Sequence, residues 1–226
     1  MKTIVLTVSL GLAAIGFMAC GQPAGNTAMN HNGMMMNGNK AMNQDAMPMN
    51  ANHDTSATHH NEMESSPNAA SQSYDLQFID TMSAHHQGAI EMAGVAVSKS
   101  TNPDLKAFAQ KIIDDQKKEI ADMKDWREKW YSGKPAAKNM EMPGMGDSMK
   151  LMMGDGMKKL EQASGKQFDL LFLDMMTPHH AGATVMAKDA LAKAEHPEIK
   201  TLANNIIKAQ EAEIKQMANW KASWSK

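Results

Sequence analysis

Two pairs of adjacent histidines are the residues in this chain that are best suited to bind a metal. The stretch TMSAHHQGAIEMA places the first pair between two methionines, and MTPHHAGATVMA places the second pair in the same setting. Imidazole nitrogen is a ligand for copper, zinc and iron, whereas the thioether of methionine is a soft ligand suited to Cu(I). The combination of the two ligand types therefore raises the question of copper binding.

The spacing of the first cluster suits a helix. Met82 precedes His85 by three residues and His86 by four, so the three side chains can share one helix face. Met92 lies two turns beyond His85, and Met123 can approach from a partner helix. The alternative to a metal site is a hydrogen-bonded core network, in which glutamine and glutamate of the partner helix satisfy the imidazoles. Those partners are Gln116, Glu119, Gln210 and Glu213.

The cluster belongs to an internal duplication. Residues 75–130 align with residues 169–224 at a constant offset of 94, without a gap. The offset gives a second set of candidate ligands: Met176, His179, His180, Met186 and Met217. Burying unpartnered polar groups twice would cost about 1–3 kcal/mol each, so we favour metal binding over the metal-free network.

Each repeat reads as a helical hairpin, because its apolar residues recur at alternating spacings of three and four. Between the helices of the first hairpin, Asn102 suits the N-cap and Pro103 the first turn, and Pro197 has the same place in the second. Ser164 and Gln167 offer a capping box to the third helix. One hairpin cannot bury its own seam, so the sequence predicts an all-α fold, a single four-helix bundle with pseudo-twofold symmetry. Two small separate domains are the alternative.

The metal-ligand types favour Cu(I), with Cu(II) or Ag(I) as further candidates. Zinc gains little from methionine. A di-iron site needs inward carboxylates and Glu-x-x-His spacing, and neither seam contains that motif. The net charge of −2, without a basic stripe, gives no indication of a nucleic-acid partner.

Residues 1–20 read as a secretory signal: a lysine, a short apolar run and a small-residue end. The end, FMAC, is similar to the lipobox of bacterial lipoproteins, and Cys20 is the only cysteine, so we expect lipidation there. An ordinary signal peptide is the alternative. The protein is predicted to be exported to the periplasm or cell envelope, and to touch the membrane by its lipid anchor only.

Methionine-rich segments flank the first repeat. Residues 21–70 are rich in Asn, Met, Gly and His and are expected to be disordered. They either capture metal or serve as a plain linker. The folded part is expected at 71–226, with repeats at about 73–131 and 166–226 and a connector at 132–165. The secondary metal candidates are Met34, Met35, Met36, Met47 and Met49 in the tail and Met140, Met142 and Met145 in the connector, which we interpret as a soft-metal surface. Gap-filling in the core accounts for the later connector methionines.

The paired motifs resemble a known family. HHQGAIEMA and HHAGATVMA, followed by QKKEIADMKDW and QEAEIKQMANW, are similar to the hallmarks of the bacterial domain of unknown function 305 family. The resemblance covers about residues 71–226 and implies a ferritin-like helical bundle. Tandem, methionine-rich members of the family include a periplasmic copper-binding protein. The implied ligands are the two methionine–histidine clusters named above. Thr184 and Val185 replace Ile90 and Glu91, so the two sites need not be equivalent.

The sequence thus predicts an exported binding protein that sequesters or ferries Cu(I) in copper resistance, with the metal ion and another copper-handling protein as partners. Its sites use neutral imidazoles, so binding should weaken as the pH falls. One alternative is a metal-dependent redox enzyme, such as a cuprous oxidase. The other is a metal-free structural lipoprotein.

Overall fold

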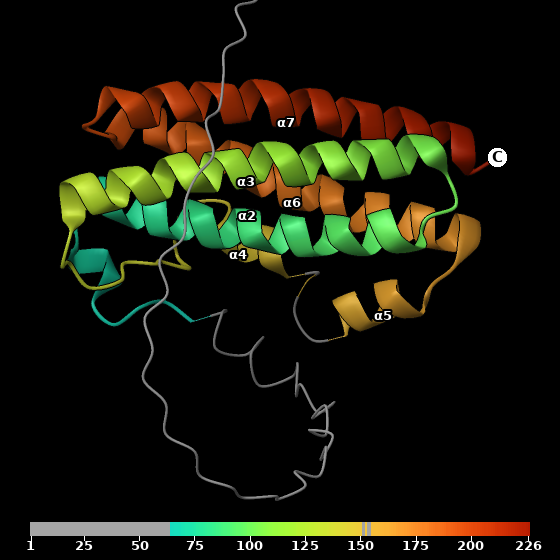
Figure 1. The fold of residues 1–226 in the computed structure, drawn as a ribbon, viewed down its shortest axis with the longest axis horizontal. Coiled ribbons are helices and arrows are strands. Elements are labelled where there is room, and N and C mark those ends of the chain that lie inside the picture. The colour runs from blue at the N-terminus through green and yellow to red at the C-terminus, as the bar shows by residue number, and fades with distance from the viewer. Residues whose placement is uncertain (1–63, 151, 153–154) are drawn as a thin grey trace, which may run out of the picture. The chain divides into compact units, whose positions relative to one another are not determined.

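The computed structural model describes residues 64–150, 152 and 155–226, and over these residues it is helical and contains no strand. Four long helices run side by side (Figure 1): α2 (Tyr74–Lys99), α3 (Pro103–Tyr131), α6 (Gly165–Lys193) and α7 (Pro197–Trp224). The short elements are η1 (Ala69–Ser71), α4 (Met145–Met149) and α5 (Gly156–Gln162). The expected signal segment, Cys20 and the tail methionines lie outside the described residues.

The helix starts follow local capping chemistry. The side chain of Asn102 accepts hydrogen bonds from the backbone N–H groups of Asp104 and Leu105, and Pro103 begins α3. Pro197 begins α7 in the same way. Ser164 does stand at the N-cap of α6, but its side chain makes no capping hydrogen bond. The predicted capping box is therefore not formed.

Helices α2 and α6 are antiparallel and pack against each other at the centre of the bundle. The Tyr74 hydroxyl, at the start of α2, donates a hydrogen bond to Asp189 near the end of α6 at 2.9 Å. Conversely, the Ser100 hydroxyl just after α2 donates to Asp169 near the start of α6 at 2.7 Å. The two hairpins thus close into one four-helix bundle, as the sequence predicts.

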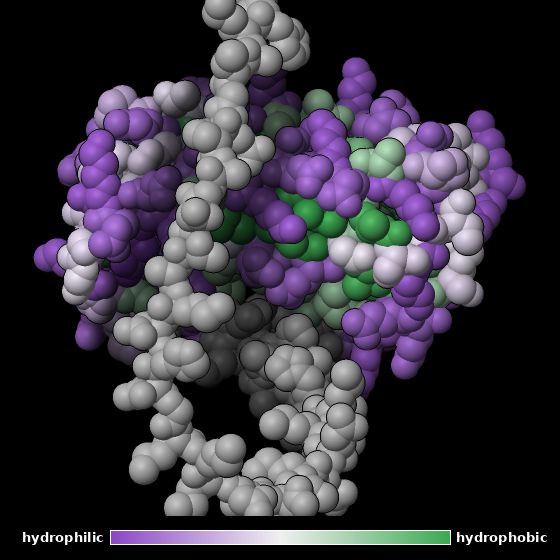
Figure 2. Space-filling model, viewed as in Figure 1, coloured by the Kyte–Doolittle hydropathy of each residue, from purple (hydrophilic) through white to green (hydrophobic). Residues whose placement is uncertain are grey.

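Two apolar clusters form the core, one on each side of the bundle's midpoint. The first contains Phe78 and Met82 from α2 with Met186 and Ala187 from α6. The second contains the later residues of α2, such as Met92, and the earlier residues of α6. Hydrophilic side chains predominate on the face in Figure 2, with hydrophobic residues visible in a limited strip. Among the described residues, none of the helices is both long and apolar enough to span a membrane.

The connector between the hairpins is folded onto the bundle. Helix α4 packs mainly against α6 (Figure 1), and Met142 and Met145 are buried in the first apolar cluster. Met140 is partly buried beside them. Met142, just before α4, and Met145, its first residue, therefore cover the core instead of forming the soft-metal surface that the sequence suggests. Residues 64–70, assigned to the tail by composition, are also held here: the Ser66 N–H donates to the carbonyl of Lys138 at 2.8 Å.

Candidate metal centre

The four histidines of the two motifs form a polar layer between the apolar clusters. All four side chains are completely buried. His85 and His179, which are equivalent in the two repeats, face each other across α2 and α6 with ring centroids 3.8 Å apart. Within each repeat, the ring of the second histidine lies farther away, at 6.3 Å for His86 and 6.4 Å for His180. The structure thus brings both motifs together at the pseudo-twofold axis.

A glutamate of the partner helix orients each outer histidine. Nε2 of His180 is hydrogen-bonded to Oε2 of Glu213 at 2.9 Å. Nε2 of His86 lies 2.7 Å from Oε2 of Glu119, an ion-pair distance without hydrogen-bond alignment. Carboxylates in this position hold metal-binding imidazoles in one orientation and increase their basicity. Each glutamate turns Nδ1 of its histidine away from itself, so Nδ1 remains for another partner.

Ser148 of α4 holds the inner histidine of the first repeat. Its hydroxyl donates to the carbonyl of Met145 at 2.8 Å and lies 2.9 Å from Nε2 of His85. Because the hydroxyl hydrogen is already used, the serine oxygen accepts and His85 Nε2–H donates. The lone pair of His85 is therefore on Nδ1. Sequence analysis did not find Ser148, since a lone serine in a connector has no recognisable pattern.

All four histidines keep an unpartnered nitrogen. Nδ1 of each ring is buried and has no hydrogen-bond partner within the described part of the chain, and Nε2 of His179 has none either. Oε1 of both Gln116 and Gln210 is likewise unpartnered. The glutamines therefore make no contribution to a hydrogen-bond network through these oxygens. Of the two glutamates, Glu213 makes its predicted hydrogen bond, while Glu119 makes an ion-pair contact only.

Burial keeps the inner histidines neutral. Desolvation lowers the pKa of His85 and of His179 well below the usual value, and repulsion from the neighbouring histidines lowers it further. The backbone of His85 raises the pKa of His179 and so partly opposes this lowering. The ring nitrogens of His179 nevertheless have no aligned hydrogen bond among the described residues. Burial alone would raise the pKa of Glu213, but His180 and Lys111 together lower it. The two inner histidines thus offer neutral imidazole lone pairs, which is the form that binds metal.

The predicted methionine ligands are all buried around this layer. Met82, Met123 and Met186 belong to the first apolar cluster, and their repeat equivalents belong to the second: Met92, Met176 and Met217. The sulfur of Met123 accepts a hydrogen bond from Ser83 at 3.7 Å, and Met217 accepts one from Thr177 at 3.8 Å. Buried methionines therefore lie in both apolar clusters that flank the histidine layer, at equivalent positions of the repeats.

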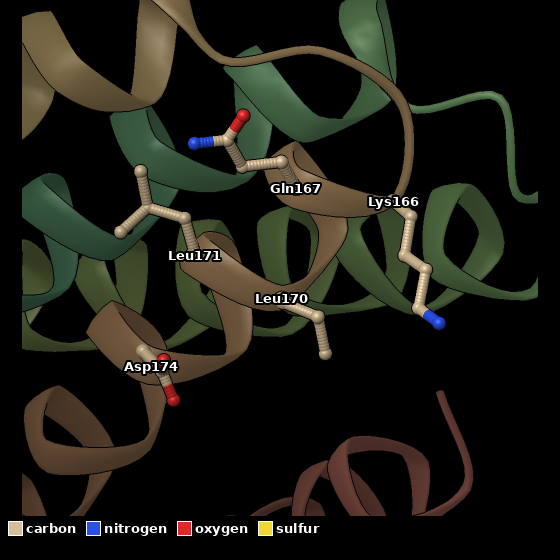
Figure 3. A pocket seen from close by; sticks show the side chains of 5 residues that line it. All are labelled: Lys166, Gln167, Leu170, Leu171 and Asp174. Atoms are coloured by element: carbon tan, nitrogen blue, oxygen red, sulfur yellow. The ribbon is translucent and has the colours of Figure 1, made fainter. Parts of the chain in front are cut away.

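Over all the described residues, the histidine layer included, no group of three or more His, Cys, Asp or Glu side chains is arranged to hold a metal ion. A shallow pocket lies on the outer face of α6 (Figure 3), away from the histidines, and its lining contains one carboxylate, that of Asp174. This carboxylate is paired with Lys221 at 2.5 Å. The histidine layer is therefore the strongest candidate site.

The family comparison confirms the resemblance seen in the sequence. The family model described as "Domain of unknown function (DUF305)" matches residues 75–221. The chain belongs to the DUF305 family. The matched range includes both histidine motifs and both glutamates. No curated protein sequence shows significant similarity to the chain.

Solved structures of DUF305 proteins share the fold. CopM in its Cu(I)-bound form is 37% identical, with a TM-score of 0.56, over 68% of this chain and 99% of CopM. The Cu(II)-bound form of CopM gives 38% identity, a TM-score of 0.57 and the same coverage. A DUF305 protein of Streptomyces coelicolor that is predicted to be secreted is 31% identical, with a TM-score of 0.60, over 68% of this chain and 93% of its own.

Proposed function

We propose that this DUF305 protein is an exported copper-binding protein that sequesters or ferries Cu(I) through the histidine layer of its bundle. The observation that carries the proposal is the buried Nδ1 atom that each of the four histidines leaves without a partner. A buried polar atom without a hydrogen bond costs about 1–3 kcal/mol. Four such atoms in one layer would strongly destabilise a core with a structural role only, and metal coordination would offset that free-energy cost.

The donor set supports copper over zinc or iron. The rings offer imidazole nitrogen, the buried methionines of the two apolar clusters offer thioether sulfur, and both suit Cu(I). Among the described residues, no three or more His, Cys, Asp or Glu side chains are arranged to hold a metal ion. We infer that methionine supplies the remaining donors of the site. Zinc gains little from that ligand. Glu119 and Glu213 are engaged with histidines, so they serve as orienting groups rather than as ligands of an iron pair.

The comparisons support the same metal. CopM has been solved with Cu(I), Cu(II) and silver, and each of these structures matches this chain. Export fits the sequence of residues 1–20 and the Streptomyces relative that is predicted to be secreted. We propose that Cys20 carries a lipid anchor, that the protein acts in the periplasm or cell envelope, and that another copper-handling protein receives its ion.

A competitive Cu(I) titration against a chromophoric chelator, under anaerobic reducing conditions, tests the proposal. The inner pair His85 and His179 and the outer pair His86 and His180 are each changed to leucine, which resembles histidine in volume and avoids a large cavity. Loss of tight binding in either double variant, with helical content retained in circular dichroism, is the expected result. Undiminished binding in both would move the function to the methionine segments. The absence of tight binding in the wild type would refute the copper proposal.

The same samples test for a redox enzyme. A binding protein consumes at most a stoichiometric amount of oxygen when loaded with Cu(I) and exposed to air. Continued oxygen uptake with excess Cu(I), abolished in the His85→Leu/His179→Leu variant, would instead indicate a cuprous oxidase.

A further inference from the structure

Two glycines in equivalent positions of the repeats let the connector reach the histidine layer. Gly88 and Gly182 each follow the second histidine of a motif by two residues. A Cβ on Gly182 would lie 2.2 Å from Cβ of Ser148 and 2.4 Å from the carbonyl oxygen of Gly144. Such contacts are far too short, so the close approach of α4 to α6 requires glycine. The approach places Ser148 against Nε2 of His85.

The equivalent place beside the first motif is filled by Met152. A Cβ on Gly88 would lie 3.0 Å from Sδ of Met152 and 3.5 Å from Nε2 of His179. The sulfur and this nitrogen therefore flank the same point on the surface of α2. The two repeats are related by the pseudo-twofold axis. Ser148 lies beside His85 of the first repeat, and Met152 lies at the equivalent position beside His179 of the second.

The two inner histidines consequently have different partners. Nε2 of His85 is occupied as a donor to Ser148, while Nε2 of His179 has no hydrogen-bond partner among the described residues and lies near a thioether. Met152 is partly buried against both apolar clusters, and its N–H is bonded to the carbonyl of Met149 at 2.9 Å. The connector thus places the Ser148 hydroxyl beside His85 and the Met152 sulfur beside His179.

We propose that Met152 is a ligand contributed by the connector, and that it holds Cu(I) together with Nε2 of His179. The inference rests on the proposed function. It places one ion at Nε2 of His179, which leaves the Nδ1 atoms of the other three histidines as the remaining donors of the layer. The imidazole nitrogen and the thioether each donate a lone pair to the ion, and no electron is transferred. A soft sulfur from the connector favours the monovalent ion over Cu(II). Ser148 excludes the equivalent arrangement at His85, so the duplicated motifs form one connector-bound site rather than two.

The full chain carrying Met152→Leu tests this assignment, with Met157→Leu as the matched control. Met157 is also a partly buried connector methionine, but it packs on the second apolar cluster alone. In the chelator competition, Met152→Leu is expected to weaken the tightest Cu(I) site roughly tenfold or more, as loss of a metal partner does. The control should leave that site unchanged. Gly88→Ala, which pushes the sulfur away without removing it, should weaken the site as well.

A second readout separates coordination from packing. In protein labelled with ¹³C at the methionine methyl groups, a single equivalent of Ag(I) should shift the Cε resonance of Met152, assigned through its absence in Met152→Leu. An unshifted resonance and wild-type affinity in Met152→Leu would show that the side chain only fills space. The inference would then be wrong, although histidine-dependent binding would still uphold the copper function. If the histidine variants also bind as tightly as the wild type, the proposed function fails together with it.

Discussion

At the scale of single residues, the histidine layer is defined by which ring nitrogens are used. Glu213 takes Nε2 of His180, Ser148 takes Nε2 of His85, and the Nδ1 atoms are left over. The sequence predicts the ligand types and the glutamate partners, because both recur at the 94-residue offset. It cannot predict that His85 faces His179 or that a connector serine sets a tautomer, because these contacts depend on how distant segments pack.

Acid should destabilise the metal-free protein through the inner histidines. Burial lowers the pKa of His85 and His179 below the ordinary value of 6.5, so the unfolded chain takes up protons that the folded chain does not. Above pH 6.5 this difference costs no stability. Below pH 6.5 the free energy of unfolding falls by about 1.4 kcal/mol per inner histidine for each pH unit. Urea denaturation at pH 7 and pH 5 measures this slope. The His85→Leu/His179→Leu variant should lack it, and an equal slope in both proteins would contradict the assignment.

The two outer glutamates should each support metal affinity. Glu119→Gln and Glu213→Gln keep the side-chain size but remove the charge that orients and polarises an imidazole. We expect each to weaken Cu(I) binding roughly tenfold. Lys111→Met is the control, because Lys111 pairs with Glu213 at 3.1 Å from an exposed position and does not contact the rings. Unchanged affinity in both glutamine variants, measured by chelator competition, would show that the carboxylates serve only the fold.

At the scale of helices, the four long elements follow directly from local sequence. Alternating three- and four-residue spacing defines α2 and α6, and Asn102 with Pro103 marks the start of α3. The connector lacks such periodicity, and its apolar residues are methionines in a glycine- and proline-containing stretch. Its role as a cover of the core depends on the close contact at Gly182, which is a tertiary feature. The sequence therefore suggests a methionine surface where the structure has Met142 and Met145 buried in the core.

Gly182→Ala should detach α4 from α6. The added Cβ would meet Cβ of Ser148 and the backbone of Gly144, neither of which can yield without moving the connector. We expect a loss of roughly 1–3 kcal/mol in the free energy of unfolding. Gly94→Ala is the matched control in α2: nothing lies within 4 Å of its Cβ position, so it should stabilise the protein by about 1 kcal/mol. Urea denaturation compares the two, and similar effects would argue against a close contact at Gly182.

At the scale of the whole molecule, the duplication predicts the bundle, because a lone hairpin would leave its seam exposed. It does not predict how the repeats are tied together, since equivalent residues have acquired different partners. Asp75 accepts hydrogen bonds from the N–H groups of Glu195 and His196 at the start of α7. Its equivalent, Asp169, accepts one from the hydroxyl of Ser100. Only the structure reveals this difference, because both aspartates begin the same motif.

Asp75→Ala should therefore destabilise the bundle more than Asp169→Ala. Asp75 is almost fully buried, and Oδ2 lies 2.6 Å from Nδ1 of His196 in addition to its backbone donors. Its removal leaves the N–H groups of Glu195 and His196, just before α7, without their acceptor and removes a tie between α2 and the second hairpin. Hydrogen bonds to a charged group contribute about 1.5–3 kcal/mol, so we expect a loss of about 3 kcal/mol, against about half of that for Asp169→Ala. Urea denaturation followed by both tryptophan fluorescence and circular dichroism measures the two losses.

The same curves test whether the repeats unfold together. Because Asp75 joins the repeats, the unfolding transitions seen by fluorescence and by circular dichroism should no longer coincide in Asp75→Ala. Equal losses and coincident transitions in both variants would mean that the apolar seam alone holds the repeats together.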